Sequence, residues 1–81
     1  MVEAKFKKSD YVINRSAGDM AIIKGITKKN YYQFETYYSA MFDKLKKINC
    51  DLQVNYQKFW DLCTDEEKKK LDEIIKEKGE K

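Results

Sequence analysis

The only arginine of the chain is the first candidate for anion binding. Arg15 lies in the turn-forming segment 14–18, Asn-Arg-Ser-Ala-Gly. A planar guanidinium beside amide and hydroxyl groups can hold a phosphate or a carboxylate through paired hydrogen bonds. Loops on rigid hairpins often carry functional side chains, so Arg15 and its neighbour Asn14 are predicted to contact a partner. The alternative is an ordinary solvent-exposed turn.

Lysines and tyrosines follow one another in the next part of the chain. Cations beside aromatic faces are the elements of phosphate pairing and base stacking. We expect a hairpin to bring these side chains close to Arg15. The alternative is that one tyrosine of each pair lies in the core and the other is half covered. With Arg15 and Asn14, the predicted binding residues are Lys28, Lys29, Tyr31, Tyr32, Tyr37 and Tyr38.

The charge of the chain is unevenly distributed. Residues 1–48 contain ten Lys/Arg and five Asp/Glu, whereas residues 49–81 contain seven and nine. A basic half attracts anionic partners such as nucleic acid, a nucleotide or an acidic protein surface, although exposed lysines also serve solubility. The lysine run 68–70 is offset by acidic neighbours and is a weak candidate for such contacts.

The residue types that catalysis and metal binding most often use are scarce. The sequence has no histidine and two cysteines, Cys50 and Cys63, so a Cys/His zinc set cannot be assembled. We predict no enzyme activity, no metal and no cofactor. Both cysteines are expected to be small buried residues rather than a disulfide, because no secretion signal is recognised. No apolar run is long enough to cross a bilayer, so we expect a cytoplasmic protein without membrane contact.

The first half of the chain has the pattern of β-strands. A short apolar stretch at 10–13 ends in the turn-forming segment, and Met20, Ile22 and Ile26 then follow with period-two spacing. Gly25 lies where a strand would bend or bulge. Residues 31–38 are rich in aromatic and β-branched side chains and predict a third strand.

Residues 31–48 also fit a helical spacing, best from Ser39 onward, so a short helix or helical turn is predicted across residues 40–47. Alternation of Leu52, Val54 and Tyr56 predicts another strand. Phe59 and Trp60 are expected to fill an end of the core, because a chain of this length needs its largest side chains inside.

A C-terminal helix has the clearest local signal. Thr64 and Glu67 form a capping box, in which each side chain bonds the backbone amide of the other residue. The helix is predicted over residues 64–78, with Gly79 as its stop signal. Its only apolar stripe is Leu71, Ile74 and Ile75, which suits docking on one side of a small sheet.

The segment 6–12, followed by a glycine-containing turn and residues 20–26, resembles the opening of SH3-like barrels of the Tudor and KOW type. Those families often begin with a phenylalanine, a Gly-Asp pair and a valine before a hairpin, and Ser9 stands here in place of that glycine. The resemblance covers about the first third of the chain. It implies a binding module for nucleic acid or protein, often a partner of an RNA polymerase or a ribosome.

These patterns predict an α+β fold: a small antiparallel sheet, or an SH3-like partly open barrel of about four to five strands, with a C-terminal α-helix. We expect one domain over 1–81, strand-rich from 5 to 60. The leading hypothesis is a non-catalytic protein whose basic, tyrosine-rich face binds an anionic partner. Two other hypotheses remain open. One is an inhibitor of the kind encoded by phages and mobile elements, which blocks a host effector or sequesters a nucleotide signal. The other is a structural subunit that forms a homodimer.

Overall fold

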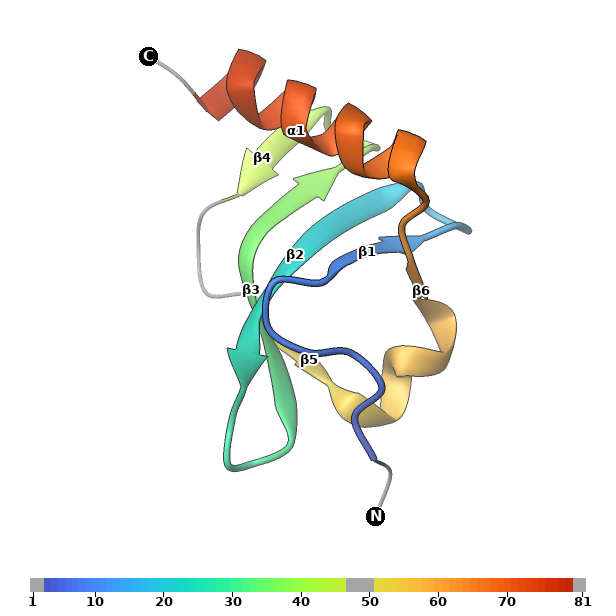
Figure 1. Ribbon diagram of the computed structural model, residues 1–81, viewed down its shortest axis with the longest axis vertical. Coiled ribbons are helices and arrows are strands. Elements are labelled where there is room, and N and C mark those ends of the chain that lie inside the picture. Colours follow the sequence, from blue (N-terminus) through green and yellow to red (C-terminus); the bar gives the residue numbers. More distant parts are fainter. Residues whose placement is uncertain (1–2, 47–50, 80–81) are drawn as a thin grey trace.

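The computed structural model describes residues 3–46 and 51–79, which form one antiparallel sheet with a helix at the C-terminal end of the chain (Figure 1). The predicted α+β fold is confirmed. The elements in chain order are β1 (Tyr11–Asn14), β2 (Asp19–Ile26), β3 (Tyr31–Ser39), β4 (Lys44–Lys46), β5 (Asp51–Gln53), the 3₁₀ helix η1 (Val54–Phe59), β6 (Asp61–Leu62) and α1 (Asp65–Gly79).

The strands follow the order β4-β3-β2-β1-β6, and β5 also pairs with β3. Strands β1, β2 and β3 form a meander, and β6 then returns to the outer edge of β1, where Val12 pairs with Leu62. The sheet does not close, because β4 and β6 lie at the two ends of this path among the described residues. None of the helices in the described residues is long and apolar enough to cross a membrane.

Both faces of the central strand β2 are buried. On one face, Ala21 and Ile23 join a core of eight buried residues, listed in full as Phe6, Val12, Ala21, Ile23, Tyr32, Phe34, Val54 and Trp60. On the other face, Met20 and Ile22 pack with Leu71 of α1. This alternation follows from the period of two in a strand. It explains why β2 has an almost continuous apolar run.

A bulge interrupts the pairing of β2 with β3, as Gly25 predicts. The register shifts between Ile22 and Ile23 and again between Ile23 and Gly25, and Lys24 has no Cα partner in the ladder. A bulge changes the direction of the strand beyond it. Ile26 is therefore 43% exposed and does not share the buried face of Met20 and Ile22, contrary to the prediction.

Helix α1 covers the upper end of the sheet in Figure 1. Leu71 is fully buried there, and Ile74 and Ile75 pack against the same cluster, as their spacing predicts. The capping box forms as predicted: the Thr64 amide donates to Glu67 Oε1 (2.8 Å), and the Glu67 amide donates to Thr64 Oγ1 (3.2 Å). Cys63 is free and buried beside this helix. The prediction for Cys50 lies outside the described residues.

The tyrosine-rich segment is a strand, which confirms one of the two patterns it contained. The short helix or helical turn predicted across 40–47 is wrong for residues 44–46, which form β4; residues 40–43 form a turn, and residue 47 lies outside the described part. The turn is held by side chains, because the Ala40 amide donates to Asp19 (2.9 Å) and the Tyr38 hydroxyl donates to Asp43 (2.6 Å). Asp43 also has a left-handed φ of 51°, which a continuing α-helix does not allow. Met41, placed by the helical spacing on an apolar face, is 84% exposed.

The strand predicted from Leu52 to Tyr56 is only partly correct. Strand β5 ends at Gln53, and the chain then turns into η1. Gln57 explains the change, because its side chain is buried and bonds the N-terminal segment: Nε2 donates to the Glu3 carbonyl (2.7 Å), and Oε1 accepts from the Lys5 amide (2.9 Å). Trp60 is buried as predicted, but Phe59 is 57% exposed, so its assignment to the core is wrong.

Candidate functional site

Arg15 joins the β1–β2 turn to the start of α1. Its Nη1 and Nη2 donate to the two carboxylate oxygens of Glu67 at 2.7 and 3.1 Å, and its Nε lies 3.4 Å from Asp61 Oδ2. The hydrogen bond from Arg15, followed by the one from the Thr64 amide, holds the pKa of Glu67 below its ordinary value. The guanidinium predicted to bind a partner thus forms a bidentate pair with the capping residue of the helix.

Asn14 shapes the same turn. Its side-chain oxygen accepts from the amides of Ser16 (3.1 Å) and Ala17 (3.3 Å), and its carbonyl accepts from the Gly18 amide (2.7 Å). Gly18 has a φ of +79°, a conformation that glycine adopts without steric cost. The predicted binding role of Asn14 therefore competes with a structural role in the turn.

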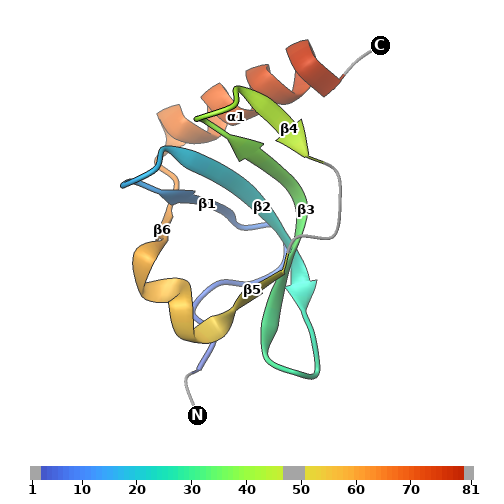
Figure 2. The ribbon, with the colours of Figure 1, turned by 180° about the vertical axis from the view of Figure 1, so that it is seen from behind.

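The structure does not bring Arg15 and Asn14 together with Lys28 and Lys29. Residues 15–18 connect β1 to β2 and residues 27–30 connect β2 to β3, so the two turns lie at opposite ends of β2. Figure 2 shows the first turn beside α1 and the second at the far end of the molecule. The expected single hairpin face is therefore split into two.

The four predicted tyrosines contribute little exposed aromatic surface. Tyr32 is fully buried, and its hydroxyl donates to Gln57 Oε1 and accepts from the amides of Lys5 and Phe6. Tyr31 is half-buried, so in this pair one tyrosine is core and the other is half covered. Its hydroxyl accepts from Gln53 Nε2 (2.9 Å).

The second pair is divided between the two faces of the sheet. Tyr37 packs on the core around Trp60, and its hydroxyl donates to Asp19. Tyr38 packs on the helix side, and its hydrogen bond to Asp43 raises the pKa of its hydroxyl. Both residues are half-buried, so each exposes only part of its surface.

Exposed lysines gather at the end of the molecule away from α1. The N-terminal segment crosses β2 there, because the Ser9 amide donates to the Ile23 carbonyl (2.7 Å) and the Ile23 amide donates to the Asp10 carbonyl (2.9 Å). Ser9 makes this crossing with a left-handed φ of 74°. We call this region the basic end; its lysines are Lys5, Lys7, Lys8, Lys24, Lys28 and Lys29, all exposed.

The charges of the basic end lack ionic partners in the part of the chain that the structure describes. The ion pairs between described residues join Arg15 to Asp61 and Glu67, and Lys78 to Asp43. All of these pairs involve the β1–β2 turn, the β3–β4 turn or α1. The lysines of the basic end are therefore available to an external anion.

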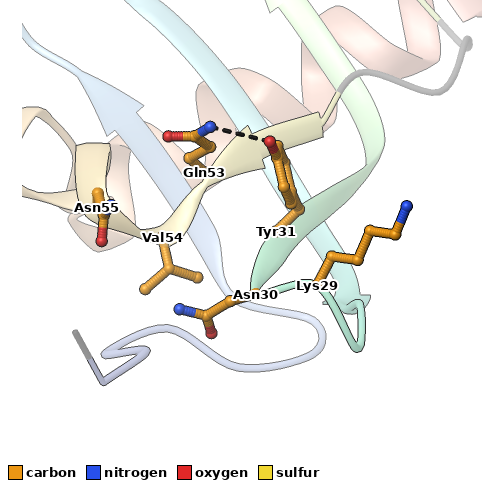
Figure 3. Close-up of a pocket in the computed structure, with 6 residues that line it drawn as sticks. All are labelled: Lys29, Asn30, Tyr31, Gln53, Val54 and Asn55. Carbon is orange, nitrogen blue, oxygen red and sulfur yellow. Dashed lines mark hydrogen bonds between the residues drawn. The ribbon is translucent and has the colours of Figure 1, made fainter. Parts of the chain in front are cut away.

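A pocket of about 230 Å³ opens between the β2–β3 turn and the start of η1 (Figure 3). In Figure 3, Gln53 points toward Tyr31 and Val54 points toward Asn30, whereas Asn55 lies at one side of the group and the Lys29 side chain extends away at the other. The Val54 amide donates to the Asn30 carbonyl (3.1 Å), which fixes the two walls relative to each other. The pocket combines amide, phenol and ammonium groups with one apolar residue, Val54, and such a lining can bind a small polar or anionic group.

Two exposed aromatic residues near this pocket were not predicted as site residues. Tyr56 is 50% exposed and Phe59 is 57% exposed, and their rings stack on each other on the surface of η1. The spacing of three residues was present in the sequence. The alternation in 52–56, however, predicts a strand, and the short chain length predicts that Phe59 lies in the core.

Within residues 3–46 and 51–79, there is no group of three or more His, Cys, Asp or Glu side chains that could hold a metal ion. No protein-family model, curated protein or solved structure matches the chain.

Proposed function

We propose that this chain is a non-catalytic binding protein whose basic end engages an anionic partner. The observation that carries the proposal is the gathering of exposed lysines at that end, namely Lys5, Lys7, Lys8, Lys24, Lys28 and Lys29. None of them forms an ion pair among the described residues; the lysine run 68–70 of α1 is likewise unpaired there, but it lies among acidic residues of the same helix. An excess of one charge at one end steers an oppositely charged partner to that end.

The pocket at the basic end supports the same proposal. Lys29 lies at its rim, and Asn30, Tyr31, Gln53 and Asn55 provide hydrogen-bonding groups within it. Long-range attraction by the lysines would bring the anion in, and these polar groups would fix its position. Of the residues predicted from sequence, Lys28, Lys29 and Tyr31 belong to this site, and Arg15, Asn14, Tyr32, Tyr37 and Tyr38 do not.

We also propose that the resemblance to SH3-like barrels extends to the architecture. Its support is the meander β1–β2–β3, the return of β6 to β1, and the position of Phe6 in the core that this arrangement surrounds. A cytoplasmic location belongs to the same proposal, since the free thiol of Cys63 fits a reducing compartment.

The test uses inorganic polyphosphate, a polyanion without bases, measured by isothermal titration calorimetry. The double variant Lys28→Ala/Lys29→Ala should bind more weakly than the wild type, and affinity should fall as salt is raised. The matched control is Lys68→Ala/Lys69→Ala on α1, which removes the same charge from an exposed lysine pair. Equal weakening by both double variants would assign the binding to net charge and reject the site.

A further inference from the structure

The aromatic pair on η1, Tyr56 and Phe59, is exposed and belongs to neither of the two core clusters. The ring centroids of Tyr56 and Phe59 are 6.4 Å apart, with 24° between the ring planes. In a 3₁₀ helix, residues three apart lie directly above one another, so η1 holds the two rings stacked on each other. About half of each side chain remains accessible to a ligand.

The pair is fixed to the basic end from two sides. Val54, the first residue of η1, donates to the carbonyl of Asn30 in the β2–β3 turn. Gln57 lies between Tyr56 and Phe59 in sequence, and its side chain bonds the backbone of Glu3 and Lys5 in the N-terminal segment. Figure 1 shows η1, in yellow to orange, at the same lower end of the molecule as the β2–β3 turn and the N-terminal segment.

One lysine lies over the Phe59 ring, and other lysines and amides lie on neighbouring parts of the basic end. Lys58 lies between the two aromatic residues in sequence and places its Nζ 5.3 Å from the centre of the Phe59 ring. Lys5 is held near η1 through its backbone, and Asn55 of η1 lines the pocket with Lys29. Aromatic faces, ammonium groups and hydrogen-bonding amides thus occur together on one rigid element and its neighbours.

We propose that the anionic partner of the basic end is a single-stranded nucleic acid, whose bases stack on Tyr56 and Phe59. Lys5, Lys29 and Lys58 neutralise the phosphates, and the amides of the pocket bond an adjacent base or sugar. This inference rests on the proposed function and adds the chemical class of the ligand. A single strand is required because the faces of paired bases are covered by their neighbours in a duplex.

The lysines favour nucleic acid over an acidic peptide because they flank aromatic faces. Carboxylates would pair with the lysines alone and would leave Tyr56 and Phe59 exposed to water. Bases use both features, since every base has a face for stacking and every nucleotide a phosphate. An acidic peptide is therefore the competing ligand that the experiment must exclude.

The experiment measures fluorescence anisotropy with a short labelled oligothymidylate and with an abasic oligomer of the same length and charge. The wild type should bind the oligothymidylate more tightly than the abasic oligomer. Tyr56→Ala and Phe59→Ala should each weaken oligothymidylate binding by about 5- to 150-fold, the range for loss of one stacked base, and should leave abasic binding unchanged. Tyr56→Phe, which keeps the ring, should retain the wild-type affinity.

The matched control is Phe42→Ala. Phe42 is 62% exposed and also has a lysine over its ring, with Lys46 Nζ 5.9 Å from the ring centre, but it lies in the β3–β4 turn beside α1. Its replacement should not change oligothymidylate binding. Melting temperatures of all variants should stay near that of the wild type, because the truncated side chains are exposed.

Four results would overturn the inference. Equal affinity for the oligothymidylate and the abasic oligomer would mean that charge alone binds, and the proposed function would stand without stacking. Equal affinity for duplex and single strand would also reject stacking. If polyglutamate binds more tightly than the oligothymidylate, and Phe59→Ala weakens that binding, the site would be assigned to an acidic peptide. Failure of both the oligothymidylate and polyphosphate to bind would reject the proposed function together with the inference.

Discussion

The substitution Tyr32→Phe tests whether the buried hydroxyl at the centre of the basic end is a structural group. The Tyr32 hydroxyl lies 3.0 Å from the Lys5 amide and 3.2 Å from the Phe6 amide, and it donates to Gln57 Oε1. After its removal the Lys5 amide still has Gln57 Oε1 as an acceptor, at 2.9 Å. The buried Phe6 amide has no other acceptor among the described residues.

One buried donor without a partner costs about 1 to 3 kcal/mol in the free energy of unfolding. For a domain of this size each 1 kcal/mol lowers the melting temperature by about 4 to 8 °C. Urea denaturation followed by tryptophan fluorescence should therefore show a lower midpoint for Tyr32→Phe with an unchanged m-value. Trp60 is buried and reports on the same core.

The preceding residue provides the matched control. Tyr31 is half-buried, and its hydroxyl accepts one hydrogen bond, from Gln53. Water can replace that partner, so Tyr31→Phe should cost no more than about 0.5 kcal/mol. If both variants lose the same stability, or if Tyr32→Phe loses less than its neighbour, the hydroxyl does not hold the N-terminal segment to η1 and the reasoning is wrong.

Two further predictions concern the α1 end of the molecule. Because Arg15 bonds the capping residue, Arg15→Ala should lower the melting temperature and raise the pKa of Glu67 in an NMR titration, while polyphosphate binding stays unchanged. Arg15→Lys should not restore the wild-type melting temperature, since an ammonium cannot form the bidentate pair. Tyr11 donates to Asp72 (2.5 Å), and this hydrogen bond, with burial, raises its pKa from 10.0 to about 12. Because the pKa of Tyr11 is higher in the folded state, its protonated hydroxyl stabilises the folded state fully below pH 10, and this stabilisation is lost as the pH rises to about 12. The difference in melting temperature between wild type and Tyr11→Phe should therefore shrink between pH 10 and about pH 12. A constant difference would contradict the hydrogen bond as the cause.

Local chemistry was sufficient to predict α1. The capping box depends on two side chains three residues apart, and the buried stripe depends on a period that a single helix defines. Strands β1 to β3 were also predictable, because alternating apolar residues and turn-forming residues define them within a few positions. These elements establish the α+β fold without knowledge of which strands pair.

Segments whose structure depends on distant partners were not predictable in the same way. The turn at 40–43 is held by Asp19, and η1 is held by the bonds of Gln57 to Glu3 and Lys5. A sequence window around residue 42 or residue 57 does not contain these partners. Periodicity alone therefore gave a helix in the first segment and a strand in the second, and tertiary hydrogen bonds decided against both.

The sequence predicts a site of lysines beside aromatic residues, and the site proposed for the basic end keeps this chemistry with other members. Its half-exposed aromatic residues are Tyr56 and Phe59, not the tyrosine pairs of β3. The difference lies in what each side chain contacts within the fold. Residue type alone does not reveal those contacts, because the same phenol can satisfy a buried amide, as in Tyr32, or remain exposed, as in Tyr56.

The contacts that each cation makes within the fold also decide which cations can bind a ligand, and they favour the basic end. Arg15 has the better geometry for binding a phosphate, but its donors already bond Glu67, so an external anion would have to displace a carboxylate held by two hydrogen bonds. The lysines of the basic end have no carboxylate partner among the described residues, although the ammonium of Lys5 lies over the Phe6 ring. An external ligand therefore gains more from the lysines than from Arg15, although arginine is intrinsically the stronger anion binder. Because the exposed rings of η1 lie at that same end, the cations and the aromatic faces left open by the fold are placed where one ligand can contact both.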